Sequence, residues 1–143
     1  MTRREVIAAG AGILATGFLK SGISYAAKAS TSGDSRETLI DSALSCIKTG
    51  EICQQHCLDL LSAGDKSMAD CAKSVAEMLT MCQALAELAA QKSSHLPKLA
   101  AICADVCKTC EKNCRVHEAH HAICKNCAES CARCASECLK VAA

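Results

Sequence analysis

Cysteine recurs at alternating steps of three and four residues in two stretches of the chain. These stretches are Cys103-x3-Cys107-x2-Cys110-x3-Cys114 and Cys124-x2-Cys127-x3-Cys131-x2-Cys134-x3-Cys138. Steps of three and four residues return to the same face of an α-helix. At about 100° per residue, the thiols of the first stretch fall within about 60° of arc and those of the second within about 80°. Each stretch therefore predicts a helix with a row of sulfur atoms along one face.

The remaining cysteines follow the same rule. Cys46, Cys53 and Cys57 fall within about 40° of arc on one helix. Cys71 and Cys82 are about three helical turns apart, so they also share a face. We therefore expect all 14 cysteines to point into one interior.

A few turn signals divide the second part of the chain into helices. Gly64-Asp65, the segment 93–95 and the segment 118–120 are the predicted breaks, and Pro97 suits the first turn of a helix. The predicted helices span about 35–63, 67–91, 97–117 and 121–140. Helices joined by short loops predict an all-α fold, an antiparallel up-down-up-down four-helix bundle with a cysteine-lined core.

Antiparallel alignment of these helices also predicts layers of cysteines. The layer nearest the first and third loops contains Cys57, Cys71, Cys114 and Cys124. The layer farthest from them contains Cys46, Cys82 and Cys138.

Residues 1–29 have the features of a twin-arginine (Tat) signal peptide that is removed. Arg3 and Arg4 precede an apolar run at 6–19, and small residues follow it. An apolar run of about 14 residues is too short to span a bilayer comfortably. We therefore expect residues 30–143 to be the mature domain, without stable membrane insertion. Its expected location is the periplasm or the lumen of internal membranes, with Sec export as the alternative route.

The composition argues against several classes of function. Both aromatic residues, Phe18 and Tyr25, lie in the predicted leader, so the mature domain needs another way to fill its core. Removal of the leader changes the net charge from +1 to about −2, which offers no basic surface for nucleic acid. The sequence shows no nucleophile–base motif, no glycine-rich phosphate loop and no carboxylate pair at metal-ligand spacing. We therefore do not expect an enzyme.

The number of aligned thiols favours metal binding. One or two buried thiols pack as small hydrophobic groups, but 14 on aligned faces need another explanation. Disulfides between residues three or four apart would close small loops and constrain the unfolded chain little. Structural zinc sites use four ligands, usually from loops. The ferredoxin run ends in proline, which follows none of these cysteines. Cu(I) is soft and accepts two or three thiolates, two of which one helical pair can supply.

Charge balance predicts the stoichiometry. Buried thiolates without a cation would be very costly, so the metal-free thiols must stay largely protonated. One Cu(I) per thiolate gives a neutral core, and bridging sulfur atoms permit that ratio. We expect a capacity approaching one Cu(I) per cysteine, with release of protons on binding.

With these motifs, and with Cys53-x3-Cys57, the chain resembles the bacterial four-helix-bundle copper storage proteins, in particular their exported, Tat-dependent members. The resemblance implies storage of Cu(I) inside the bundle as a reservoir for copper enzymes, access through one open end, and a homotetramer. The open end in that family carries histidine and methionine, for which His56 and Met68 are the candidates here. The roles of His117, His120 and His121 stay open.

The complete set of predicted metal ligands consists of these two residues and every cysteine. It comprises Cys46, Cys53, Cys57, Cys71, Cys82, Cys103, Cys107, Cys110, Cys114, Cys124, Cys127, Cys131, Cys134, Cys138, His56 and Met68. The alternative functions are a ferredoxin-like iron–sulfur protein of electron transfer and a copper chaperone or detoxification protein.

Overall fold

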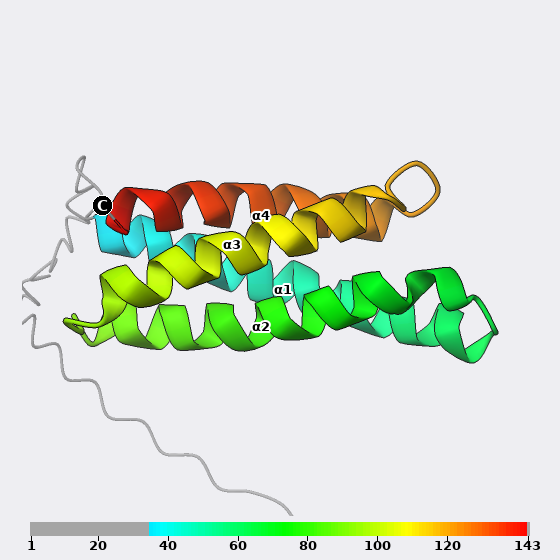
Figure 1. Ribbon diagram of the computed structural model, residues 1–143, viewed down its shortest axis with the longest axis horizontal. Coiled ribbons are helices and arrows are strands. Elements are labelled where there is room, and N and C mark those ends of the chain that lie inside the picture. The colour runs from blue at the N-terminus through cyan, green and yellow to red at the C-terminus, as the bar shows by residue number, and fades with distance from the viewer. Residues whose placement is uncertain (1–34, 143) are drawn as a thin grey trace, which may run out of the picture.

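The computed structural model describes residues 35–142. The predicted leader and the start of the mature domain lie outside this range. The described chain folds into four long helices, α1 (Ser35–Ser62), α2 (Ala69–Ala90), α3 (Leu96–Arg115) and α4 (Ala122–Val141), with a 3₁₀ helix η1 (Lys66–Met68) before α2 (Figure 1). The predicted all-α bundle is confirmed, and every helix end lies within two residues of its predicted position. No described helix is long and apolar enough to cross a membrane.

The breaks between the helices follow from local backbone chemistry. Gly64 has a φ of 97°, a conformation that glycine adopts without a steric penalty. Asp65 then accepts hydrogen bonds from the backbone N–H and the hydroxyl of Ser67, which starts η1. Pro97 lies in the first turn of α3, where its missing N–H costs no helical hydrogen bond. These signals make each helix run antiparallel to its predecessor.

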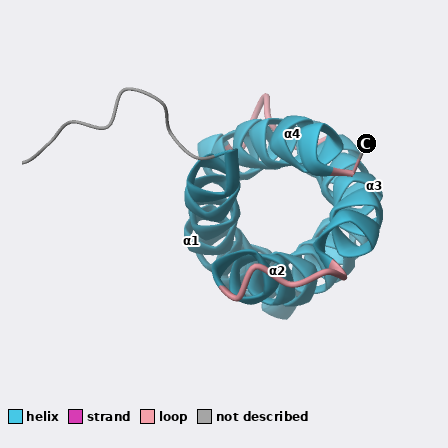
Figure 2. Cartoon of the chain, turned by 90° about the vertical axis from the view of Figure 1, so that its left-hand side faces the viewer, coloured by secondary structure: helices cyan, strands magenta, loops and turns pink. Residues whose placement is uncertain are grey.

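The helices form a ring in which each contacts its two neighbours, α1 with α2 and α4, and α3 with α2 and α4 (Figure 2). One glycine permits the close approach of α1 to α2. A Cβ atom at Gly50 would lie 2.6 Å from Cε of Met78 and 2.8 Å from Cδ2 of Leu79. Helix α1 therefore continues through position 50, where any residue larger than glycine would require the side chains of Met78 and Leu79 to move.

The two ends of the bundle differ in chemistry. At one end, which we call the apolar end, Leu39, Leu85 and Leu96 are at most 5% exposed and fill the space between the helices. At the other end lie the segments 63–68 and 116–121, which carry most of the histidines. We call it the histidine end. The thiol-lined interior is thus bordered by leucine side chains at one end and by histidine side chains at the other.

Candidate metal centre

All the cysteines are free thiols with no exposed surface, and every helix contributes some of them. The helical spacing predicted from the sequence therefore does bring them into one interior. Among the described residues, the only buried polar side chains besides these thiols are Ser74 and Ser130. Both hydroxyls donate to carbonyl groups of their own helices, to Cys71 and Asn126 respectively. The core thus contains no charged group that could neutralise a thiolate, so only a bound cation can do so.

The sulfur atoms form five groups in which all Sγ atoms lie within 4.8 Å of one another. Two groups contain four thiols: Cys46, Cys82, Cys107 and Cys134, which we call the middle group, and Cys53, Cys57, Cys71 and Cys124, which we call the end group. Three groups contain three thiols: Cys53, Cys114 and Cys127; Cys110, Cys127 and Cys131; and Cys103, Cys134 and Cys138. Cys53, Cys127 and Cys134 each belong to two groups, which joins the groups into two sets. Hydrogen bonding of Cys131 with Cys107 connects the two sets, so the thiols form a nearly continuous column of sulfur.

Contacts between helices set the spacing of this column. Sγ of Cys82 on α2 lies 3.9 Å from Sγ of Cys107 on α3 and 4.0 Å from Sγ of Cys134 on α4. Nearer the histidine end, Sγ of Cys71 lies 3.4 Å from Sγ of Cys114. Three thiolates around one Cu(I) need sulfur separations of this order. The described core can therefore offer both two- and three-coordinate sites for a soft monovalent ion.

The interior controls the protonation of the thiols. Hydrogen bonding with Cys114 and other neighbours, together with burial, raises the pKa of Cys53 far above its ordinary value. Contacts with Cys103 and Cys107 do the same for the pKa of Cys82. In contrast, S–H donation from Cys114 favours the thiolate of Cys71 and lowers the pKa of Cys71. The thiols with a raised pKa are therefore protonated in the absence of metal, and a metal ion must displace their protons to bind.

The two predicted ligands other than cysteine are both at the histidine end. His56 is half-buried, and its Nε2 lies 3.0 Å from Nδ1 of His121. The ring of His117 lies 6.4 Å from that of His121, centroid to centroid. Met68 has no exposed surface and packs in the core. His120 is exposed, and His95 is exposed at the apolar end.

The pairing of His56 with His121 was not predicted from the sequence, since 65 residues separate them. The only available signal was that both fall in the outermost layer of the antiparallel alignment. The prediction that Cys46 and Cys82 form a last layer with Cys138 is wrong: both group with Cys107 and Cys134, and Cys138 groups with Cys103. The alignment from the loops missed this grouping because it assumed parallel helix axes and helices of equal length, whereas α1 is longer than the others.

An all-α bundle with a core of this kind belongs to the class of cysteine-lined metal-binding bundles, and the comparisons with known proteins specify the family. The family model described as "Csp: Copper storage protein" matches residues 32–143. The chain therefore belongs to the copper storage protein family, as the cysteine motifs predicted.

Individual relatives agree with this assignment. The chain is 27% identical over 107 residues to the uncharacterized cysteine-rich protein YhjQ of Bacillus subtilis (strain 168), covering 75% of this chain and 95% of the relative. It is similar to apo-Csp3, copper storage protein 3 of Bacillus subtilis, with 29% identity and a TM-score of 0.66 over 75% of this chain and 98% of that one. It is also similar to the Cu(I)-bound copper storage protein BsCsp3, with 26% identity and a TM-score of 0.69 over 77% and 100% of the chains.

Proposed function

We propose that this chain stores many Cu(I) ions on the cysteine thiolates inside its bundle. The observation that carries the proposal is the column of 14 fully buried thiols, which fall into closely spaced groups of three and four. One Cu(I) per thiolate leaves this column neutral, whereas the surrounding hydrocarbon offers nothing else to balance negative charge. The similar Bacillus subtilis protein with bound Cu(I) supports the same cargo.

The test is an anaerobic titration of the reduced protein with Cu(I), followed by gel filtration and measurement of copper and thiols in the protein peak. We expect saturation near one Cu(I) per cysteine and release of protons. Saturation at one or two ions per chain would contradict storage and favour a chaperone. Colour distinguishes the remaining alternative, because Cu(I) thiolate protein is colourless and an iron–sulfur protein is brown.

We extend the proposal to the ligands at the histidine end. His56, which is paired with His121, directly precedes Cys57 of the end group, and the buried Met68 lies three residues before Cys71. The imidazole nitrogen and the thioether sulfur are donor atoms that carry no negative charge. Neutral donors can bind Cu(I) without holding it as tightly as thiolates do. In this proposal they receive copper and pass it inward, while the leucines of the apolar end close the opposite route.

The large number of buried thiols supports a role as a copper reservoir rather than as a chaperone or an enzyme. Delivery by a chaperone needs an accessible site, and every thiol here has no exposed surface. We propose a non-enzymatic protein that supplies copper to copper enzymes. Measuring the metal content of protein purified from copper-grown native cells tests this role: protein from such cells should carry several copper ions per chain.

Export and assembly are the last parts of the proposal. The twin-arginine leader at residues 1–29 supports export of a folded domain through Tat. Leu44, Ile52 and Leu58 on α1 are 51%, 51% and 44% exposed, which supports burial against other copies in a homotetramer.

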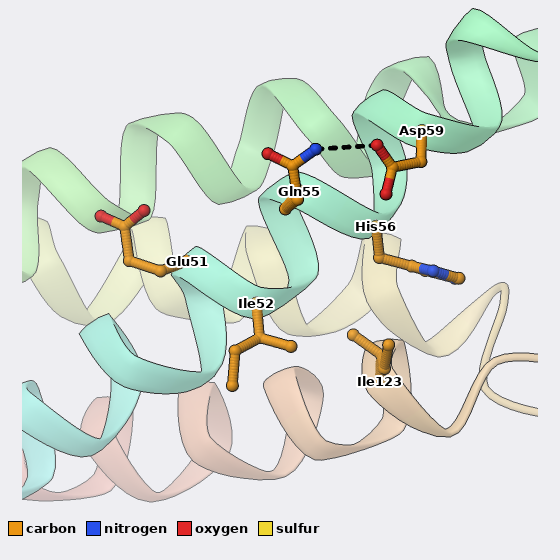
Figure 3. A pocket seen from close by; sticks show the side chains of 6 residues that line it. All are labelled: Glu51, Ile52, Gln55, His56, Asp59 and Ile123. Atoms are coloured by element: carbon orange, nitrogen blue, oxygen red, sulfur yellow. Dashed lines mark hydrogen bonds between the residues drawn. The ribbon is translucent and has the colours of Figure 1, made fainter.

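A surface hollow of about 470 Å³ beside this helix combines apolar and acidic side chains (Figure 3). Its lining consists of Glu51, Ile52, Gln55, His56, Asp59 and Ile123.

Fractionation of cells and light scattering of the purified mature domain test location and assembly, respectively. Retention in the cytoplasm would contradict export, and a monomer at high protein concentration would contradict the tetramer.

A further inference from the structure

The two four-thiol groups have nearly the same geometry. In the middle group, Sγ of Cys82 lies 3.9 Å and 4.0 Å from the sulfur atoms of Cys107 and Cys134. In the end group, Sγ of Cys53 lies 4.0 Å from Sγ of Cys124. Zinc holds four thiolates at about 2.3 Å in a tetrahedron, which places the sulfur atoms about 3.8 Å apart. Each group therefore already resembles the tetrahedral set that a divalent ion with a filled d shell requires.

Charge distinguishes the two groups. Four thiolates around a divalent ion carry two net negative charges, whereas Cu(I) thiolate at equal numbers is neutral. In the middle group, the cysteines lie near the centres of their helices, far from any helix end. Their buried surroundings are aliphatic side chains and further thiols. No N-terminus of a described helix lies near enough to compensate the excess negative charge of a divalent site there, in a medium of low polarity.

The end group includes two cysteines that lie at helix N-termini. Cys71 is the third residue of α2, which begins at Ala69, and Cys124 is the third residue of α4, which begins at Ala122. Each N-terminus carries about half a positive charge. Thiolates in this position are stabilised. The other two members, Cys53 and Cys57, lie more than one turn before the end of α1 and so avoid its negative C-terminus.

A neighbouring thiol adds further stabilisation. Sγ of Cys114 lies 3.4 Å from Sγ of Cys71 and is outside the end group, so it can remain protonated and donate to the Cys71 thiolate. Donors to coordinated thiolates tune a metal site in the same way that other outer contacts do.

We propose that the end group, formed by Cys53, Cys57, Cys71 and Cys124, binds one divalent ion of the zinc or cadmium type in a four-thiolate tetrahedron, and that the middle group does not. Binding releases the thiol protons to solvent, four at most, and forms four metal–sulfur bonds. The bound ion ties α1, α2 and α4 together at the histidine end. In a copper-free cell it occupies the thiols that lie nearest the proposed route of copper, and Cu(I) must displace it to use them.

The test is a titration of reduced, metal-free mature protein with Cd²⁺, followed through the ultraviolet thiolate-to-cadmium band and ¹¹³Cd NMR in the presence of a competing chelator. We expect one tight site per chain with a single resonance typical of four sulfur ligands. Cys71→Ser and Cys124→Ser, on different helices, should each weaken it at least about tenfold. The matched variants Cys82→Ser and Cys134→Ser of the middle group should leave it unchanged.

Circular dichroism of each variant verifies that the bundle is folded, and two variants per group keep the comparison valid if one of them unfolds. Two equal tight sites, no tight site, or equal losses in all the variants would overturn the proposal. A Cu(I) titration of the same samples separates this inference from the storage proposal. Protein that fills with Cu(I) but has no tight Cd²⁺ site contradicts only the inference. Protein that binds one Cd²⁺ tightly but only one or two Cu(I) contradicts only storage.

Discussion

His56 on α1 and His121 at the start of α4 place Nε2 and Nδ1 3.0 Å apart, which joins the two ends of a sequence interval of 65 residues. At this distance one imidazole ring can donate an N–H hydrogen bond to the other, and the tautomers decide which ring is the donor. The pair stands beside the buried thiols of the end group, at the end of the bundle opposite the leucines. It therefore occupies the boundary between solvent and the sulfur column.

This position predicts a kinetic role. His56→Ala and His121→Ala should each slow the uptake of Cu(I) several-fold, because neutral ligands at the boundary are lost, while the final capacity stays the same. His95→Ala is the matched control, since His95 is exposed at the apolar end. Stopped-flow measurement of the ultraviolet thiolate band after mixing with a Cu(I) complex gives the rate. Equal rates in all three variants would refute a role for the pair in uptake.

The shared cysteines predict unequal effects of single substitutions on capacity. Cys53 belongs to two of the sulfur groups, whereas Cys138 belongs to one. Cys53→Ser should therefore lower the number of bound Cu(I) ions by more than one, and Cys138→Ser by about one, because a bridging sulfur serves more than one ion. Copper-to-protein ratios after gel filtration measure both. The same loss in each variant would indicate that the groups fill independently.

The sequence predicted most of the fold because cysteine, unlike leucine or alanine, marks the inward face of every helix without ambiguity. The i, i+3, i+4 steps of Cys103–Cys114 and Cys124–Cys138 determine both the helical state and the buried face. The level at which residues on different helices meet depends on tilt and on unequal helix lengths, which leave no periodic signal. For this reason the grouping of Cys46 and the contact between His56 and His121 emerged only in three dimensions.

Gly50 illustrates the same limit at a single residue. Helix propensity alone assigns glycine inside a helix a cost of about 1 kcal/mol against alanine. In three dimensions the absent Cβ leaves the space that Cε of Met78 and Cδ2 of Leu79 fill. The local preference for alanine and the packing of α1 on α2 thus oppose each other at this position.

In the Gly50→Ala variant, the cost of overpacking should exceed the gain in helix propensity. Gly50→Ala gains about 1 kcal/mol of helix propensity, but overpacking of a filled core costs about 1–3 kcal/mol. We expect a net decrease of about 1 kcal/mol in the free energy of unfolding, measured by urea denaturation of the reduced protein. A double-mutant cycle with Leu79→Ala should show coupling, because the shortened side chain makes room for the new methyl group. A stabilised Gly50→Ala variant would show that the two side chains shift without cost.

The protonated core predicts that the copper-free protein loses stability in alkaline solution. The pKa of Cys53, Cys82 and Cys131 lies above the ordinary value of 9.0 because of contacts with neighbouring thiols and burial. Above pH 9 the unfolded chain loses these protons and the folded chain keeps them. Their contribution to stability is therefore complete below pH 9 and is lost as the pH rises, by up to about 1.4 kcal/mol per pH unit for each thiol. The thiols with a lowered pKa act in the opposite direction, but only below pH 9, where the unfolded chain still holds their protons. They are Cys71, Cys107, Cys124, Cys127 and Cys134.

Thermal unfolding of the reduced protein from neutral pH to beyond pH 9 measures this effect. Thiols with a raised pKa predominate, so we expect the midpoint of the copper-free protein to fall. The copper-loaded protein is the control, and its midpoint should change much less because thiolates bound to metal no longer titrate. A flat or rising midpoint in the copper-free protein would mean that the folded core tolerates thiolates without metal. In that case, charge neutralisation could not explain a capacity of one Cu(I) per cysteine.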